Sequence, residues 1–174
     1  MLRVTFFVLA GLAWTSSSFA QVDPKLHADV VKLVGASGER ESMQKALPQQ
    51  LDAARFRMMS ETCKGCDPAF GEEWVKQMNA HTNIDDYIHV IEHAYETHLT
   101  DEDVQQMMAL VNQTKAGQKP TPSDGLRQKL TAAMPAIRNE IAKKNTEAST
   151  KLGTDVRAEL EKQHPEWFKN MQKP

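Results

Sequence analysis

Apolar residues recur at the helical period along almost the whole chain, and capping residues, glycines and prolines divide this pattern into segments. We find no strictly alternating run and no pair of β-branched runs around a hairpin turn. The longest periodic stretch begins at Ser123 and continues to Leu160, with lysine and glutamate dense on its other face. The sequence therefore predicts an all-α fold, a single irregular domain of about six helices over residues 21–174.

Helix boundaries follow from capping chemistry and from residues that interrupt a helix. We expect helix starts at Asp23-Pro24, at Asp67-Pro68, at Thr82 with Asp85, and at Thr100 with Asp103. Gly117 and the stiff Pro120-Thr121-Pro122 linker predict a stop. Pro48 and Pro135 fall inside helical patterns, where a missing N–H group predicts a kink or a break.

Residues 1–20 have the organisation of an export signal. Arg3 supplies a positive start, Val4 to Trp14 form an uncharged and mostly apolar run, and Ser18-Phe19-Ala20 gives the small-residue pattern that precedes cleavage. The apolar run is too short for a stop-transfer helix. We therefore expect cleavage after Ala20, a periplasmic or secreted location, and no stable membrane insertion of the remaining chain.

The charge balance argues against two classes of partner. Lysine and arginine number 21 and acidic residues 23, for a net charge of −2, and the basic residues are dispersed. Nucleic-acid binding and strong attraction to anionic lipid both call for clustered positive charge. We therefore expect no nucleic-acid partner and no strong electrostatic attraction to a membrane surface.

Cys63 and Cys66 form a C-x-x-C pair, for which an oxidising compartment predicts a local structural disulfide. Gly65 gives the tight turn its conformational freedom. The alternative is a thiol-redox protein, in which a helix N-terminus lowers the pKa of the first thiol. Here the pair follows a predicted helix end, where the dipole has the opposite sign. Free thiols or half of a metal site remain further alternatives.

The segment His89-Val90-Ile91-Glu92-His93 matches the H-x-x-E-H string of inverted zinc peptidases. Two histidines one turn apart can bind zinc, and the glutamate can activate its bound water. At about 100° per residue, His89 and His93 lie opposite the apolar arc of their helix, with Glu92 at its edge. We therefore expect a solvated histidine face and no cofactor. A zinc-dependent hydrolase at these residues and adventitious metal affinity are the alternatives, and no third ligand is evident.

The central segment, about residues 84–140, resembles a bacterial exported family known as domain of unknown function 2059. The matching residues are Tyr95, Leu99-Thr100-Asp101-Glu102-Asp103, Lys115-Ala116-Gly117-Gln118-Lys119 and Met134-Pro135. The chain departs from the family at Leu110-Val111, where an aromatic pair is usual, and at its inserted Pro120-Thr121-Pro122. The resemblance implies an all-helical exported domain and carries no activity or catalytic residue.

No Ser-His-Asp set, glycine-rich phosphate loop or paired-carboxylate arrangement is legible in the sequence. Helical spacing assigns Met58-Met59 and Met107-Met108 to core filling more readily than to a plastic binding surface. We therefore expect an exported, non-enzymatic helical module of the envelope, one that presents a groove or face to a protein partner whose identity the sequence does not give.

Overall fold

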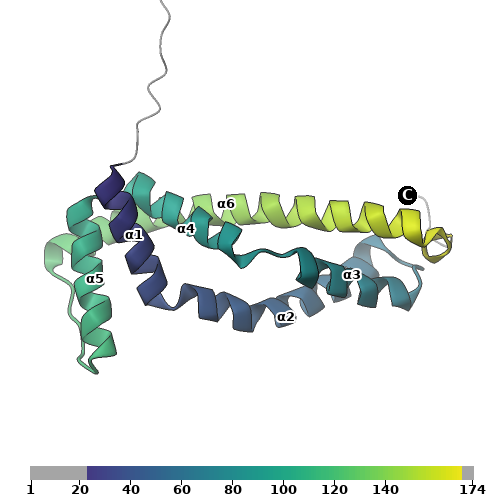
Figure 1. Cartoon of the computed structure of the whole chain (residues 1–174), viewed down its shortest axis with the longest axis horizontal. Helices are drawn as coiled ribbons and strands as arrows, with labels where there is room; N and C mark the ends of the chain where they lie inside the picture. Colours follow the sequence, from purple (N-terminus) through teal and green to yellow (C-terminus); the bar gives the residue numbers. More distant parts are fainter. Residues whose placement is uncertain (1–22, 170–174) are drawn as a thin grey trace, which may run out of the picture.

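Six α-helices and two short helical turns make up the part of the chain that the structure, a computed structural model, describes, residues 23–169 (Figure 1). The elements are α1 (Pro24–Ser37), α2 (Glu39–Arg57), the π-helical turn η1 (Met58–Thr62), α3 (Pro68–His81), α4 (Ile84–His98), α5 (Asp101–Lys115), α6 (Asp124–Gln163) and the 3-10 turn η2 (Pro165–Phe168). This confirms the all-α prediction. The predicted leader, residues 1–20, lies outside the described residues, and the single-domain boundary stays a prediction.

Two hydrophobic cores lie toward opposite ends of the molecule, and α6 contributes buried side chains to both. The first core joins α1, α4, α5 and the N-terminal half of α6; its buried residues are Val30, Leu33, Val34, Ile88, Ile91, Ala94, Leu99, Val104 and Ile137. The second joins α2, α3 and the C-terminal half of α6; its buried residues are Leu51, Cys63, Cys66, Phe70, Trp74, Met78, Val156 and Leu160. Trp167 and Phe168 of η2 pack against this second core.

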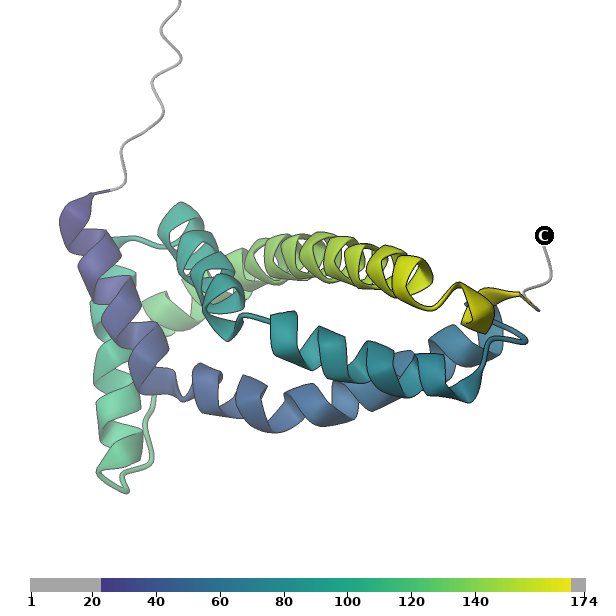
Figure 2. The same cartoon turned by 45° about the vertical axis from the view of Figure 1, so that its right-hand side comes forward.

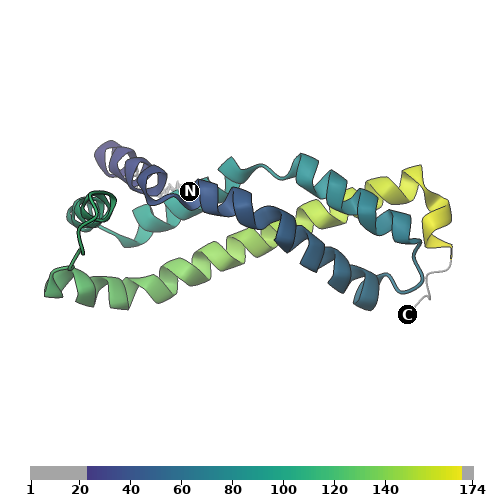
Figure 3. The ribbon, with the colours of Figure 1, turned by 90° about the horizontal axis from the view of Figure 1, so that it is seen from below.

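The helices α2 and α6 run in the same direction along the long axis, and α3 returns in the opposite direction (Figures 1 and 2). Seen from below, α2 crosses α6 at an angle (Figure 3). α3 packs against both of these helices, and α4 packs against α1, α2 and α6. None of the helices within residues 23–169 is both long enough and apolar enough to cross a bilayer.

Most predicted helix starts are confirmed by side-chain caps. Asp23, Asp67 and Ser123 each accept a hydrogen bond from a backbone N–H group in the first turn of the helix that follows. Thr100 and Asp103 form the reciprocal capping box at the start of α5. Gly117 adopts a positive φ of 73° just beyond the end of α5, a conformation that glycine tolerates without steric cost.

Three local predictions were wrong or incomplete. Thr82 does not cap α4; its hydroxyl donates to the carbonyl of Met78 at the end of α3, and Asn83 caps α4 instead. Neither Pro48 nor Pro135 divides its helix. Both prolines lie on exposed helix faces, so water can hydrogen-bond the carbonyl groups that lose an N–H donor.

Asp103 is a buried charged residue with hydrogen-bond partners on two sides. It is 4% exposed, and its carboxylate accepts hydrogen bonds from the Thr100 hydroxyl at 2.6 Å and from Lys129 Nζ on α6 at 2.9 Å. Burial opposes its ionisation, but the hydrogen bonds from Thr100 and Lys129 outweigh burial and lower the pKa of Asp103 below its usual value. The cap of α5 is thus also a link to α6.

We predict that Asp103→Asn lowers the free energy of unfolding by about 1–3 kcal/mol at neutral pH, because a buried, charge-assisted set of hydrogen bonds is lost. A carboxyl with a lowered folded pKa contributes stability that is present above its unfolded pKa and disappears as the pH falls through the folded pKa. The gap between wild type and variant should therefore shrink below about pH 4. Urea unfolding at several pH values measures it.

Asp124→Asn is the matched control, because the Asp124 side chain is 99% exposed. We expect this variant to stay within about 0.5 kcal/mol of wild type. A pH-independent gap for Asp103→Asn would contradict the assigned role of the ionised carboxylate.

Candidate functional site

A groove of about 1170 Å³ opens between α2 and α6; we call it the α2–α6 groove. It exists because α3 packs against both helices while few contacts join α2 directly to α6. One wall, from α2 and η1, consists of Met43, Leu47, Gln50, Leu51, Ala54, Arg57, Met58, Glu61 and Thr62. The other wall, from α6, consists of Asn145, Thr146, Ser149, Thr150, Gly153, Thr154, Arg157, Ala158 and Glu161. Between them lie Trp74, Met78, Thr82, Ile84 and Tyr87.

The α2 wall carries an apolar stripe with steps of three or four residues. Met43, Leu47 and Met58 are only partly buried by the two cores, so each also offers apolar surface to the groove. Two of the three are methionines, whose unbranched side chains adapt to irregular surfaces. The sequence prediction assigned Met58 to core filling, and the structure gives it both roles.

From Asn145 to Thr154 the α6 wall has the opposite character, because its side chains are short and four of its six lining residues carry a hydroxyl group. Across residues 142–151 the residues are exposed except for Asn145, which is partly buried. Asn145 Oδ1 is buried and has no hydrogen-bond partner within the described residues. Short side chains let a neighbouring helix approach closely, and a buried carbonyl oxygen of this kind normally finds a donor.

Charged residues line the groove only toward the end where the disulfide lies. Arg57 precedes Glu61 by one turn on the first wall, and Arg157 precedes Glu161 by one turn on the second. α2 and α6 run in the same direction (Figure 1). Both arginines therefore come before both glutamates along the groove. Arg157 also lies over the ring of Phe168, 5.9 Å from its centroid. The rest of the groove lining is uncharged.

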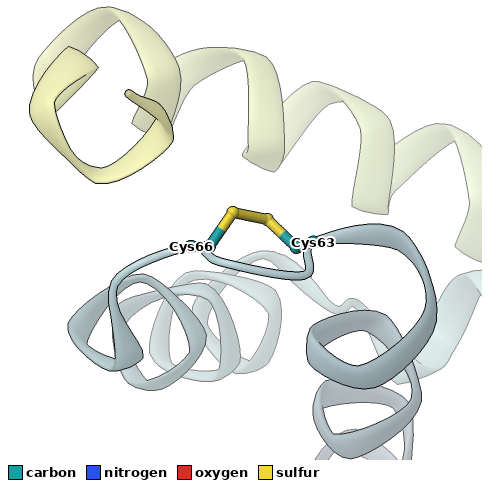
Figure 4. The surroundings of a disulfide bond; sticks show 2 residues. All are labelled: Cys63 and Cys66. Atoms are coloured by element: carbon teal, nitrogen blue, oxygen red, sulfur yellow. A yellow bond between two sulfur atoms is a disulfide. The ribbon is translucent and has the colours of Figure 1, made fainter. Parts of the chain in front are cut away.

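Cys63 and Cys66 form the predicted disulfide, with a Cα–Cα distance of 5.4 Å (Figure 4). Cys63 is 0% exposed and Cys66 is 7% exposed. The sequence predicts that both cysteines follow a helix end. Only Cys63 directly follows η1, as its C-cap, whereas Cys66 directly precedes Asp67, the cap of α3. Burial keeps both sulfur atoms from solvent, which favours the structural role over thiol exchange.

The C-terminal turn η2 covers this disulfide loop. The backbone N–H of Asp67 donates to the carbonyl of Trp167 at 3.2 Å, and Phe70 meets Phe168 edge-on with ring centroids 4.8 Å apart. The loop therefore joins the start of α3 to the end of α6, which sets how far α6 stands from α2 at this end of the groove.

The H-x-x-E-H residues are placed as the helical wheel predicts, but they do not converge. His89 and His93 have side chains 73% and 63% exposed. Glu92, expected at the edge of the apolar arc, is buried, and its carboxylate lies 2.7 Å from His89 Nδ1. His93 instead faces Glu140 of α6, at 3.9 Å. Residues 23–169 contain no group of three or more potential ligand side chains arranged for a metal ion.

Two further histidine–carboxylate pairs join α4 to its neighbours, and the sequence analysis missed both. His27 Nδ1 of α1 lies 2.6 Å from Glu96 of α4, and His98 Nε2 of α4 lies 2.9 Å from Glu140 of α6. The partners are 69 and 42 residues apart in sequence, so no local spacing could reveal them. These histidines contribute to contacts between helices.

No family model matches the chain, and no curated protein or solved structure matches it significantly.

The disulfide generates a prediction about stability. Closing so short a loop restricts the unfolded chain only modestly, so we expect reduction of the wild-type protein to cost about 2 kcal/mol. Thermal unfolding with and without reductant measures this loss. The double variant Cys63→Ala Cys66→Ala should be at least as unstable and should not respond to reductant. An unchanged unfolding temperature on confirmed reduction would contradict a stabilising bond.

The His89–Glu92 pair generates a prediction about titration. The hydrogen bond to Glu92 raises the pKa of His89 above its ordinary 6.5, against the opposing effect of burial. The pair therefore stabilises the fold fully below pH 6.5, and this contribution disappears as the pH rises through the raised pKa. In an NMR titration, Glu92→Gln should lower the pKa of His89. Glu96→Gln, which removes the partner of His27, should leave it unchanged.

Proposed function

We propose that this chain is an exported, non-enzymatic binding module whose α2–α6 groove receives an amphipathic helix of a protein partner in the cell envelope. The observation that carries the proposal is the arrangement of three helices. α3 packs against both α2 and α6, yet these two stand apart with an apolar stripe on the first and short side chains on the second. This leaves the fourth position of a four-helix arrangement without a helix.

The dimensions of the groove suit one helix. The stretch from Met43 to Glu61 spans about 27 Å at 1.5 Å per residue, which corresponds to about 18 residues of a partner helix. Helices that dock in grooves use apolar anchors at positions i, i+3, i+4 and i+7, and the stripe on α2 offers the complementary surface. A donor side chain of the partner would also satisfy the buried oxygen of Asn145.

Export is inferred from two independent features. The leader pattern of residues 1–20 has the order of a secretory signal, and a disulfide such as Cys63–Cys66 persists in oxidising compartments. The resemblance to domain of unknown function 2059 adds the same expectation. The zinc-hydrolase and thiol-redox alternatives gain less support, because the histidine string does not converge with a third ligand and both sulfur atoms are buried.

A synthetic 18-residue helix tests the proposal. The peptide carries leucine at i, i+3, i+4 and i+7 and otherwise alanine and glutamine, so that it has no charge. We expect amide chemical-shift changes confined to residues lining the α2–α6 groove. We also expect Thr150→Trp, which places a large ring on the α6 wall, to weaken binding at least tenfold, since it occupies the space that the peptide needs.

Glu147→Trp is the matched control, because Glu147 is exposed on α6 but does not line the groove. Fluorescence anisotropy should give it a dissociation constant within twofold of wild type. Equal effects of the two tryptophan variants, or shift changes elsewhere on the surface, would refute the proposed binding surface.

A further inference from the structure

We infer that the disulfide end of the α2–α6 groove selects the direction and the charge order of the partner helix, an inference that rests on the proposed function. The helix that fits runs antiparallel to α2 and α6. Near its N-terminus it carries a basic residue, followed four residues later by an acidic one.

The direction follows from the arrangement of the walls. α2 and α6 run the same way, and α3 runs oppositely (Figures 1 and 2). A fourth helix placed between α2 and α6 would have both as neighbours. In the up-down arrangement of four-helix bundles each helix is antiparallel to its neighbours, which also sets the helix dipoles in favourable opposition. The N-terminus of the docked helix then lies at the disulfide end, where α3 also begins.

The charge order follows from the lining. An antiparallel helix entering at the disulfide end first passes Glu61 and Glu161, and one turn later Arg57 and Arg157. Opposite charges on the partner therefore come in the order basic then acidic, at a spacing of about four residues. The other described lining residues are uncharged, so these four side chains set the charge order at the disulfide end of the groove.

Two peptides of identical composition test this inference. Both use the leucine pattern above; one has lysine at position 3 and glutamate at position 7, and the other has these two residues exchanged. Reversing a peptide in the groove moves its charges to the uncharged end, so the second peptide cannot recover the match. We expect the Lys-then-Glu peptide to bind about fivefold more tightly at low salt, with the preference reduced at high salt.

Exchanging the charges of one wall should weaken this preference, because Arg157 and Glu161 keep their order on the other wall. Arg57 and Glu61 are exposed, so the variant R57E/E61R retains both charges and exchanges their places on one wall. We expect it to favour the Glu-then-Lys peptide relative to wild type. The neutral variant R57Q/E61Q should reduce the wild-type preference, and it serves as the second test if the exchanged variant does not fold. The exposed pair Lys151 and Asp155 provides the control exchange, K151E/D155K, which should leave the preference unchanged.

The outcomes separate the inference from the proposed function. Equal binding of both peptides within the groove would overturn the inference and leave the proposed function standing. If neither peptide perturbs groove residues, both the inference and the proposed function are overturned. Groove shift changes that appear with protein concentration alone would assign the groove to a second copy of the chain. Shift changes with dodecanoate but not with peptide would assign it to an acyl chain. Either result refutes the partner helix.

Discussion

The structure depends on α6, a forty-residue helix that must serve two separate hydrophobic cores. Its buried anchor Ile137 belongs to the first core, and Val156 and Leu160 belong to the second. Between them the helix passes eighteen residues, 138–155, or about 27 Å at 1.5 Å per residue, without a buried residue. A helix held at both ends in this way can leave its middle section uncovered, because burial of its ends supplies the stabilisation that its own propensity does not. The α2–α6 groove lies alongside that uncovered section.

The width of the groove is fixed at its ends. At one end Arg40 of α2 pairs with Asp85 of α4, and Tyr87 of α4 meets Ser149 of α6 at 3.0 Å between hydroxyl oxygens. At the other end the disulfide loop and η2 hold α3 against the last turns of α6. Both walls are thus positioned by contacts outside the groove lining or at its edge, so the groove does not depend on a ligand to keep its walls apart. A groove formed in advance lowers the ordering cost of binding.

The sequence predicts what is local and misses what depends on the placement of helices. The caps at Asp23, Asp67 and Thr100 could be recognised because each needs only a side-chain oxygen and an N–H group within three residues. Thr82 was misassigned because its hydroxyl has a nearer acceptor in the helix before it. Pro48 was expected to bend or divide a helix that instead runs on through it.

The groove itself had one sequence signal, the absence of large apolar residues between Ile141 and Leu152. The sequence prediction did not use this absence; it treated only the lysine- and glutamate-rich outer face of this helix as solvated. Only the position of α2, more than 80 residues earlier in the chain, turns the polar section into one wall of a groove. The apolar period of α2 does not show which other segment packs beside it, because that depends on long-range packing.

The histidine string also depends on helix placement, but here the sequence suggests a site that the packing of the helices does not form. A wheel of α4 alone puts Glu92 at the edge of the apolar arc, but α4 packs against α1, α2 and α6, so the covered arc is wider than its own apolar residues suggest. Glu92 and Glu96 are covered as a result, with side chains 8% exposed, and a covered carboxylate requires a hydrogen-bond donor. His89 and His27 supply those donors. In this helix the His89–Glu92 part of a string that matches a zinc motif is accounted for by the need to satisfy a buried carboxylate.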